Sequence, residues 1–583
     1  MCALILFATL LLAPAVAAPS DPATAVDGLA ERYWQHRLQI DYNLRSQLGL
    51  PIETIRPIAL AAAEEDAAFG TSVRDDLAKI DAGSLDHDHW LTYRTLDFLA
   101  SNAVASRKYF WLEQQATPYA GGLQLSSISA ILTSFQFASA ADASRYVSLL
   151  HQYAGFVRSV RAFLEGQHER GIVLPDVDSA AAEAVFRGYE NPAESGPLVP
   201  AAARLGALSP ADAATLEKNA RNAVSSEIVP AFASVADYLA GAYRSGAPQG
   251  VGLAQYPGGR DYYQYLILAN TTLTITPEKL HELGLSEVAR LNEQLDGIRR
   301  EVGFKGTVAQ FKHYLATDPA FFPKTTEAFG ERLELYVGRA RAAVPQFFLH
   351  TPTATYGVAP LPQALAGSQT FGYYDQPKAA RPKGIYYYNA WHPERTSMLG
   401  AGALICHELI PGHHFQIALQ QENAALPNVR RYDFSETGFV EGWGEYASQL
   451  CWDMGVYQTP YDKAGRIMQD LMVSTRLVVD TGMNALGWSR ERAMAFMREN
   501  LTLSDAQIAS ESLRYSTDIP GQALAYKTGE LTMLQIREAA RERLGAAFDI
   551  RRFHAWVLDS GSMTLDTLRA HVEYEITHAP AKK

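Results

Sequence analysis

The stretch HELIPGHH, residues 407–414, has the residue types of a zinc site but an unusual spacing. Many zinc peptidases carry HExxH on a helix, because a spacing of four places both imidazoles on one face, about 6 Å apart along the axis. Here that fourth position is Pro411, and His413 and His414 follow His407 by six and seven residues. On a regular helix His414 would lie about 10.5 Å along the axis and His413 about 120° around it. Neither could then share one zinc ion with His407.

Pro411 and Gly412 predict the distortion that such a site would need. Proline lacks the amide hydrogen of a helical turn and collides with the preceding turn, and glycine relaxes the backbone constraints. We therefore expect a bulge or break between Leu409 and His413. Two looped-out residues would bring His413 to the place of the second histidine in HExxH, and three would bring His414. The smaller deformation favours His413.

A carboxylate ligand is expected from the downstream stretch SETGFVEGWGEYASQL. It contains Glu441 and Glu445, which are four residues apart and so share one helix face. Both lie among apolar residues, where an unpaired carboxylate would be costly. A metal would compensate one of them, and the other could orient a ligand histidine. The alternative is a pair of carboxylates on a solvated helix face.

A set of His407, His413 and Glu441 would leave a fourth position for water, as in catalytic rather than structural zinc sites. Glu408 directly follows a ligand histidine, where a general base could take a proton from the zinc-bound water and pass it to the leaving amine. Attack on a peptide carbonyl also needs a donor to the oxyanion, usually Tyr, His or Arg from the opposite wall of a cleft.

A second His-Glu pair, His281-Glu282 in HELGL, is a rival motif. It falls in a helix that we expect to begin at Thr276 and Pro277, a good N-cap followed by proline at the first helical position. No second histidine follows at ligand spacing, since Leu285 occupies that place. We therefore assign His281 a structural or surface role.

The segment before the zinc motif has strand composition from Ile385 to Tyr388, between Gly384 and Asn389. A strand here could offer its edge to an extended peptide, which makes Tyr386 a candidate substrate contact. The alternative is an aromatic-rich interior strand without ligand contact.

Composition describes an ordinary globular protein of two or more domains or lobes, with 583 residues, 48% of them hydrophobic. The net charge is −12 and Lys and Arg do not cluster with aromatics, which argues against a nucleic-acid partner. Amphipathic helices run from about Asp27 to Tyr243, and a Gly- and Pro-rich segment follows. We expect an N-terminal helical lobe over 18–245 and a zinc-binding region over 246–583.

The first residues, MCALILFATLLLAPAVAAPS, predict a secretory signal peptide over 1–17, although no Lys or Arg precedes the apolar run. The run is too short for a membrane span. We expect a periplasmic or secreted protein. Cys406 and Cys451 would then remain, too few for a disulfide framework, so stability should rest on the core. Cys406 is interpreted as a buried small residue rather than a ligand or nucleophile, because helical neighbours point about 100° apart.

The motif HELIPGHH, with FVEGW, RLVVDTGMNALGWSRERA and RYSTDIPGQALAYKTGE, resembles the bacterial domain-of-unknown-function 885 family, whose members are thought to be zinc metallopeptidases. The resemblance is densest from about Gly384 to Glu530. More distantly, the motifs are similar to the thimet oligopeptidase family and to dipeptidyl peptidase III. These likenesses imply a mainly α, gluzincin-like fold with two helical lobes around a cleft and a small β-sheet beside the metal-binding helix. They also favour Glu441 over Glu445 as the ligand.

The shared motif RYSTDIPGQALAYK supplies further candidates by residue type. Tyr526 or Tyr515 would donate to the oxyanion. Other candidates for substrate contact or for support of the ligands are Arg514, Gln522, Lys527, His414 and Glu445. The family commonly has histidine where this chain has Asn484, so transition-state stabilisation could be altered, or asparagine could replace one hydrogen bond.

The sequence thus predicts an exported zinc-dependent metallopeptidase that hydrolyses short peptides, with Zn2+ as cofactor and Glu408 as general base. One alternative is a zinc hydrolase of a non-peptide amide or ester. Another is a non-catalytic binding protein on a peptidase scaffold. The oligomeric state is left open.

Overall fold

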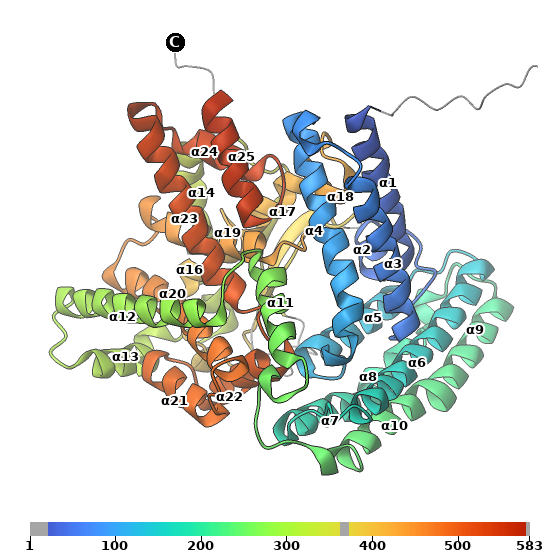
Figure 1. The fold of residues 1–583 in the computed structure, drawn as a ribbon. Helices are drawn as coiled ribbons and strands as arrows, with labels where there is room; N and C mark the ends of the chain where they lie inside the picture. The colour runs from blue at the N-terminus through green and yellow to red at the C-terminus, as the bar shows by residue number, and fades with distance from the viewer. Residues whose placement is uncertain (1–20, 362–371, 380, 579–583) are drawn as a thin grey trace, which may run out of the picture.

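The computed structural model describes residues 21–361, 372–379 and 381–578 and shows a mainly helical protein, as predicted (Figure 1). The predicted signal peptide lies outside the described residues. The helices upstream of the expected boundary are α1 (Pro22–Ile40), α2 (Tyr42–Gln47), α3 (Leu60–Leu77), α4 (His87–Tyr109), α5 (Leu123–Ser134), α6 (Ala140–His168), α7 (Asp176–Glu190), α8 (Pro192–Ser195), α9 (Pro210–Ala223) and α10 (Val229–Ala240).

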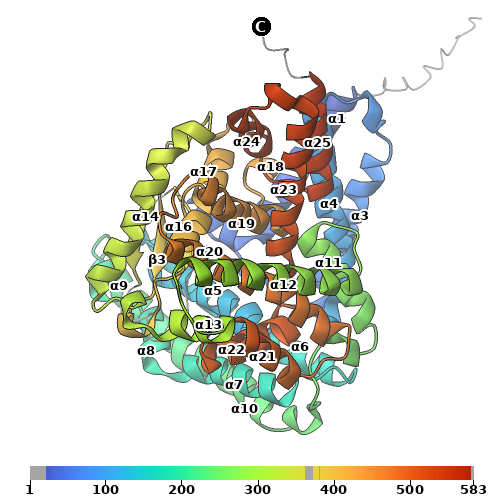
Figure 2. The same ribbon diagram turned by 90° about the vertical axis from the view of Figure 1, so that its left-hand side faces the viewer.

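Further helices follow that boundary, and Figure 2 shows α12 lying across the molecule, packed on α20. They are α11 (Gly259–Thr271), α12 (Pro277–Glu301), α13 (Val308–Thr317), α14 (Thr326–Phe347), α16 (Ala401–Glu408), α17 (His413–Glu422), α18 (Asn428–Arg431), α19 (Thr437–Asp453), α20 (Pro460–Asn484), α21 (Arg490–Asn500), α22 (Asp505–Leu513), α23 (Leu524–Leu544), α24 (Ile550–Leu558) and α25 (Leu565–His578). The predicted start of α12 is confirmed, since the Thr276 side chain accepts a hydrogen bond from the backbone amide of Lys279. Among the described residues, every helix is too short or too polar to cross a lipid bilayer.

Helices α5–α10 enclose a hydrophobic core of their own. Its buried residues come from positions 42–243, upstream of the expected boundary. A smaller core joins α1, α3 and α4 and also includes Val429 of α18, so the first helices contact the later part of the chain. The division into domains near residue 246 stays a prediction.

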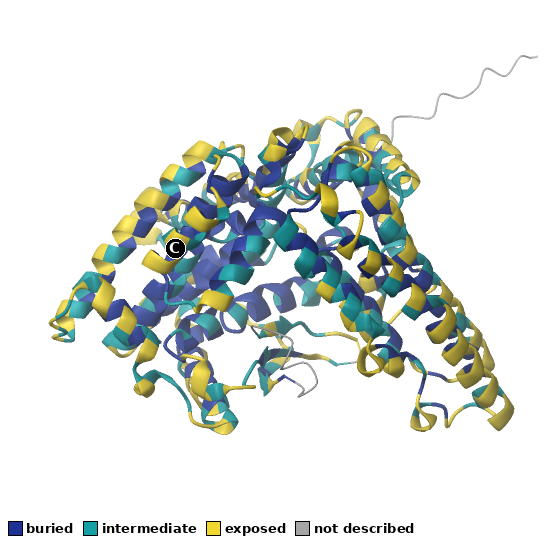
Figure 3. Cartoon of the chain, turned by 90° about the horizontal axis from the view of Figure 1, so that it is seen from below, coloured by how far each residue is buried: buried dark blue, intermediate teal, exposed yellow. Residues whose placement is uncertain are grey.

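The largest core surrounds the helices that carry the zinc motif. It combines buried residues of α14, α16, α19, α23, α24 and α25 with two tyrosines of the sheet, and Figure 3 shows the buried residues gathered in the interior. Helices α19 and α23 pack so closely that a Cβ atom on Gly442 would lie 2.5 Å from the Cα atom of Gly529. Glycine at these two positions therefore permits the close approach.

The sheet has three strands, β1 (Thr355–Pro360), β2 (Tyr373–Asp375) and β3 (Lys383–Tyr388). Their order is β1-β3-β2, with β1 parallel and β2 antiparallel to β3. The predicted strand at Ile385–Tyr388 is confirmed as part of β3. The suggestion that it offers an edge is wrong, because β3 pairs on both sides, and among the described strands the free edges belong to β1 and β2.

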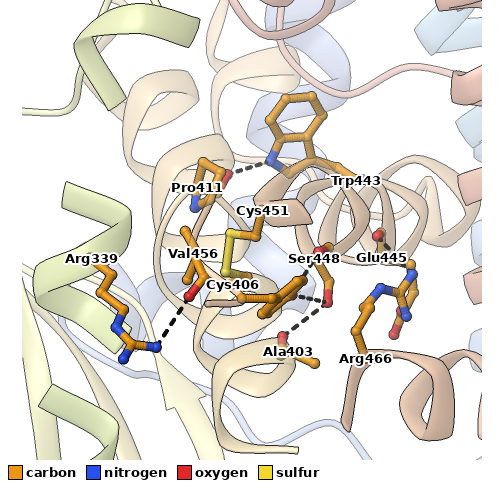
Figure 4. Close-up of a disulfide and its surroundings, with 11 residues drawn as sticks. Arg339, Ala403, Cys406, Pro411, Trp443, Glu445, Ser448, Cys451, Val456 and Arg466 are labelled. Carbon is orange, nitrogen blue, oxygen red and sulfur yellow. Dashed lines mark hydrogen bonds and ion pairs between the residues drawn. A yellow bond between two sulfur atoms is a disulfide. The ribbon is translucent and has the colours of Figure 1, made fainter. Parts of the chain in front are cut away.

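Cys406 and Cys451 form a disulfide between α16 and α19 (Figure 4). The burial of Cys406 is confirmed, but the interpretation of a plain buried residue is incomplete, because its sulfur is bonded. The Cα atoms are 6.4 Å apart, within the normal range for a disulfide. Packing of two helices brings together cysteines that are 45 residues apart. One covalent cross-link therefore supplements the core, which the cysteine count did not predict.

Loss of this disulfide is expected to lower the free energy of unfolding by about 2–4 kcal/mol, because the bond restricts the unfolded chain by closing a loop. Urea denaturation of a Cys406→Ala/Cys451→Ala double variant beside the oxidised wild type measures the difference. A double variant as stable as the wild type would contradict the expectation.

Candidate metal centre

The helix of the zinc motif is interrupted where the sequence predicted. Helix α16 ends at Glu408 and α17 begins at His413, with a cis peptide bond before Pro411 in the intervening turn. A Cβ atom on Gly412 would lie 1.8 Å from the carbonyl oxygen of His407, so only glycine fits this turn. The indole nitrogen of Trp443 donates to the carbonyl of Pro411 at 2.9 Å (Figure 4). The turn is thus fixed to α19.

The interruption brings His407 and His413 to the same carboxylate. The Nε2 atom of His407 lies 3.5 Å from Oε2 of Glu441, and the Nε2 atom of His413 lies 3.3 Å from that oxygen. We call these three residues the α16–α19 cluster. Ligand atoms around a tetrahedral zinc ion with bonds near 2.0–2.1 Å are about 3.3 Å apart. The observed separations therefore fit a zinc ion with two imidazole ligands and one carboxylate.

Unsatisfied polar atoms also mark this cluster. Within the described residues, the buried atoms Nδ1 of His413 and Oε2 of Glu441 have no hydrogen-bond partner. Burial acts to lower the pKa of His407, but its contacts with Glu441 and Glu445 raise that pKa well above its usual value. The site therefore favours a positive charge between the imidazoles and the carboxylates. A bound cation would supply that charge in place of the proton.

Glu445 supports His407 from the other side of the ring. Its Oε1 atom lies 3.2 Å from Nδ1 of His407 and accepts a hydrogen bond from Gln469, while Oε2 lies 3.2 Å from Arg466 (Figure 4). Burial raises the pKa of Glu445, but the contact with His407 and the charge of Arg466 lower it to about 2. An ionised Glu445 favours the tautomer with the proton on Nδ1, which leaves the Nε2 lone pair for a metal.

His414 points away from the cluster. Its Nε2 atom lies 3.0 Å from the carbonyl of Ala354, and its Nδ1 atom lies 2.9 Å from the hydroxyl of Tyr374. Burial lowers its pKa to about 4, so the ring is neutral at neutral pH. Both nitrogens therefore connect α17 to the sheet, and of the two neighbouring histidines only His413 faces Glu441.

Glu408 is the last residue of α16 and directly follows His407 in the chain. The charges of the cluster act on its carboxylate. Burial raises its pKa, the charges of His407 and His413 lower it, and Glu441 raises it again, with a net rise above the usual value. Tyr386 of β3 is buried nearby, where burial and the charge of Glu408 raise the pKa of its phenol. A carboxylate with a raised pKa suits a group that accepts a proton.

The ring of Tyr526, on α23, lies beside the ring of His407. The two rings are parallel to within 13°, with centroids 6.1 Å apart. The guanidinium of Arg476 lies 4.7 Å from the centre of the Tyr526 ring, and Gln522 donates a long hydrogen bond of 3.4 Å to the hydroxyl. Burial, followed by the charge of Glu441, raises the phenol pKa to about 12. Tyr526 is therefore a protonated donor beside the cluster.

Tyr515 is placed differently. Its hydroxyl donates to the carboxylate of Glu511 and accepts a hydrogen bond of 2.8 Å from Arg476. Because these partners already occupy it, Tyr526 is the better candidate for an oxyanion donor. Arg514 donates to Gln522 at 2.9 Å and so supports Tyr526 indirectly.

Lys527 and the rival histidine have structural partners. The buried ammonium of Lys527 lies 2.6, 3.0 and 3.1 Å from carboxylates of Asp470, Glu530 and Glu287, so it is held within the core. His281 contacts the hydroxyl of Thr481 at 3.0 Å.

Asn484 holds three backbone segments together. Its Nδ2 atom donates to the carbonyls of Asp480 and Tyr515 at 3.0 and 2.8 Å, and its Oδ1 atom accepts from the amide of Leu253 at 3.0 Å. The side chain is fully buried. These bonds position the segment that carries Tyr515 and agree with a hydrogen-bonding role.

The sequence did not single out Arg466, Gln469, Arg476 or Glu511. All lie on helices α20 and α22, where they occur among ordinary amphipathic residues. A signal was present in the charges of α20, because Asp462, Arg466 and Asp470, and again Arg476 and Asp480, alternate in sign at a spacing of four residues. Periodicity alone did not show which partners they would meet.

The comparisons with known proteins extend over nearly the whole chain. A family model described as "Bacterial protein of unknown function (DUF885)" matches residues 44–572, and the chain belongs to this family. No curated protein matches it. A solved structure from Colwellia psychrerythraea, described as a "putative lipoprotein", is 25% identical, with a TM-score of 0.85 over 95% of this chain and 98% of that one.

A second solved structure, a "putative lipoprotein of unknown function" from Shewanella oneidensis, is 17% identical. Its TM-score is 0.69 over 94% of this chain and 99% of that one, and it shows the fold alone. The chemistry of this chain is therefore argued from the cluster itself.

Gly444→Ala is expected to weaken zinc binding at least about tenfold, because the new Cβ atom would lie 2.6 Å from Cε1 of His407 and displace the ring. Competition with a chromogenic chelator measures the affinity. The matched control is Gly297→Ala on α12, where the added Cβ would meet open space. Unchanged zinc affinity in Gly444→Ala would show that the His407 ring is not a ligand in this orientation.

Proposed function

We propose that this protein is an exported zinc-dependent metallopeptidase that hydrolyses short peptides. The observation that carries the proposal is the convergence of His407, His413 and Glu441, with Glu408 immediately after the first of them in the chain. Two imidazoles and one carboxylate with room for a further ligand are the donor set of catalytic zinc.

When bound, zinc polarises a carbonyl group and increases the acidity of water. Side chains of the protein carry out the proton transfers and stabilise the oxyanion. Glu408 takes a proton from the attacking water and passes it to the leaving amine, which its raised pKa favours. Glu445, beside Nδ1 of His407, would hold the proton of the ring at that atom and leave Nε2 to the zinc ion. Tyr526 donates its hydroxyl hydrogen to the oxyanion that forms on the substrate.

The sheet supports a peptide as substrate. His414 joins α17 to the carbonyl before β1 and to Tyr374 of β2, so the sheet is fixed beside the helix that carries His413. Strands with a free edge can pair with the backbone of an extended peptide, and such pairing would present a scissile bond to the cluster.

Two observations support export. A disulfide is typical of proteins that fold in an oxidising compartment. Each of the two solved structures that share the fold is described as a "putative lipoprotein". Both agree with the signal peptide that the first residues predict.

Glu408→Gln is expected to retain zinc and fold but to lose activity on short peptides by about 10²- to 10⁴-fold, because the amide cannot accept the proton. Turnover of a mixture of short peptides, followed by mass spectrometry of the products, measures the loss. The matched control is Glu282→Gln in the rival His-Glu pair, an exposed residue for which full activity is expected.

Zinc-loaded wild type no more active than Glu408→Gln on every peptide would overturn the peptidase proposal. Turnover of amides or esters without turnover of peptides would retain a zinc hydrolase and replace the substrate class.

A further inference from the structure

A second group of potential ligands lies on helices that carry no part of the α16–α19 cluster. His87 is the first residue of α4, while His571 and Glu575 are four residues apart on α25 and so share one helix face. The ligand atoms of these three residues all lie within 4.8 Å of one another. Figure 1 shows α4 in blue and α25 in red on facing sides of the upper part of the molecule. We call this group the α4–α25 cluster.

Its hydrogen bonds turn a lone pair of His571 toward His87. The Nε2 atom of His571 lies 2.9 Å from the carbonyl oxygen of Trp556, which can only accept, so Nε2 carries the proton. The Nδ1 atom of His571 then carries no hydrogen and accepts a hydrogen bond from Nε2 of His87 at 2.7 Å. A carbonyl that fixes the tautomer of a histidine in this way is the usual support of a metal ligand.

The hydrogen bond between the two imidazoles occupies the place that a cation would take. Because Nε2 of His571 carries the hydrogen of that ring, the hydrogen between the rings belongs to Nε2 of His87. A cation bound by both rings would replace this hydrogen, which would pass to Nδ1 of His87 or to water.

Packing holds the ligands in place. The ring of His87 is stacked on Tyr574, with centroids 3.6 Å apart and planes within 3°. Arg430 binds the backbone and carboxylate of Asp88 at 3.2 and 2.8 Å and the carbonyl of Ser560 at 2.7 Å. The start of α4 is thus attached to the segment that precedes α25. The carboxylate of Asp88 also offsets the charge of Arg430, which would otherwise oppose a cation.

We propose that His87, His571 and Glu575 bind a second divalent metal ion that joins α4 to α25. Two imidazoles and a carboxylate suit zinc among the common divalent ions. The imidazole nitrogens would have to separate only from 2.7 Å to about 3.3 Å, a shift within the reach of side-chain rotation. Because the ligands are 484 residues apart in the chain, the ion would bind the folded state and stabilise it. This proposal does not depend on the proposed function.

Zinc stoichiometry of the full-length chain tests it. Metal-free protein is titrated with zinc and its metal content is counted by native mass spectrometry. Wild type is expected to bind two ions, and His413→Ala, which disables the α16–α19 cluster, is expected to bind one. In the His413→Ala background, His87→Gln and Glu575→Gln should each weaken the remaining site at least tenfold and abolish the rise in melting temperature that zinc causes.

The partly exposed Glu575 and His87 are chosen because His571 is buried and its replacement could unfold α25. Glu573→Gln, on the same helix and exposed, is the matched control and should keep the site intact.

A wild type that binds only one ion, lost in His413→Ala and kept in Glu575→Gln, would overturn this inference alone. One ion lost in Glu575→Gln and kept in His413→Ala would support it and contradict the zinc site of the proposed function. A second ion retained in both His87→Gln and Glu575→Gln would place it elsewhere and overturn the inference.

Discussion

The turn at Pro411 and Gly412 is the constraint on which the rest of the centre depends. It lets two imidazoles that are six residues apart face one carboxylate, and two bonds and one glycine of α19 fix its position. Trp443 donates to the carbonyl of Pro411, the disulfide of Cys406 joins the residue before His407 to α19, and Gly444 leaves space for the His407 ring. Because α19 also carries Glu441 and Glu445, one helix fixes the turn, the proposed carboxylate ligand and the carboxylate beside Nδ1 of His407.

A network of buried ion pairs lies behind the α16–α19 cluster and begins at Glu445. Glu445 meets Arg466, which in turn donates to Glu530 at 2.8 Å. Glu530 also lies 3.0 Å from Lys527. An ion pair in such a buried position is costly to break, since a remaining partner would keep an uncompensated charge. This network gives Glu445 a fixed, ionised state and explains why Lys527 belongs to the scaffold and not to the substrate surface.

Much of the centre could be predicted from local chemistry. Proline in the motif indicated a break, and the smaller deformation favoured His413 over His414. In the structure it is His413 that lies near Glu441. Two glutamates four apart in an apolar helix indicated one ligand and one supporting residue, and Glu441 and Glu445 occupy such positions. The helices upstream of residue 246 followed from the spacing of apolar residues, and the strand residues Ile385 to Tyr388 followed from composition. The mainly α fold class was an implication of the family resemblance.

What could not be predicted depends on contacts between distant segments. The disulfide needed the packing of α16 on α19, and the choice between Tyr515 and Tyr526 needed the position of Glu511, which occupies the first of them. The place of β3 in the middle of the sheet depends on a partner strand on each side. The α4–α25 cluster unites residues 484 apart, which no spacing rule connects.

The most direct test of the central claim is a crystal structure of zinc-loaded protein with anomalous difference maps at the zinc absorption edge. We predict a peak bound by the Nε2 atoms of His407 and His413 and by the carboxylate of Glu441, with the chain interrupted between α16 and α17. The absence of a peak at these atoms, or a peak bound by His414 in place of His413, would contradict the account.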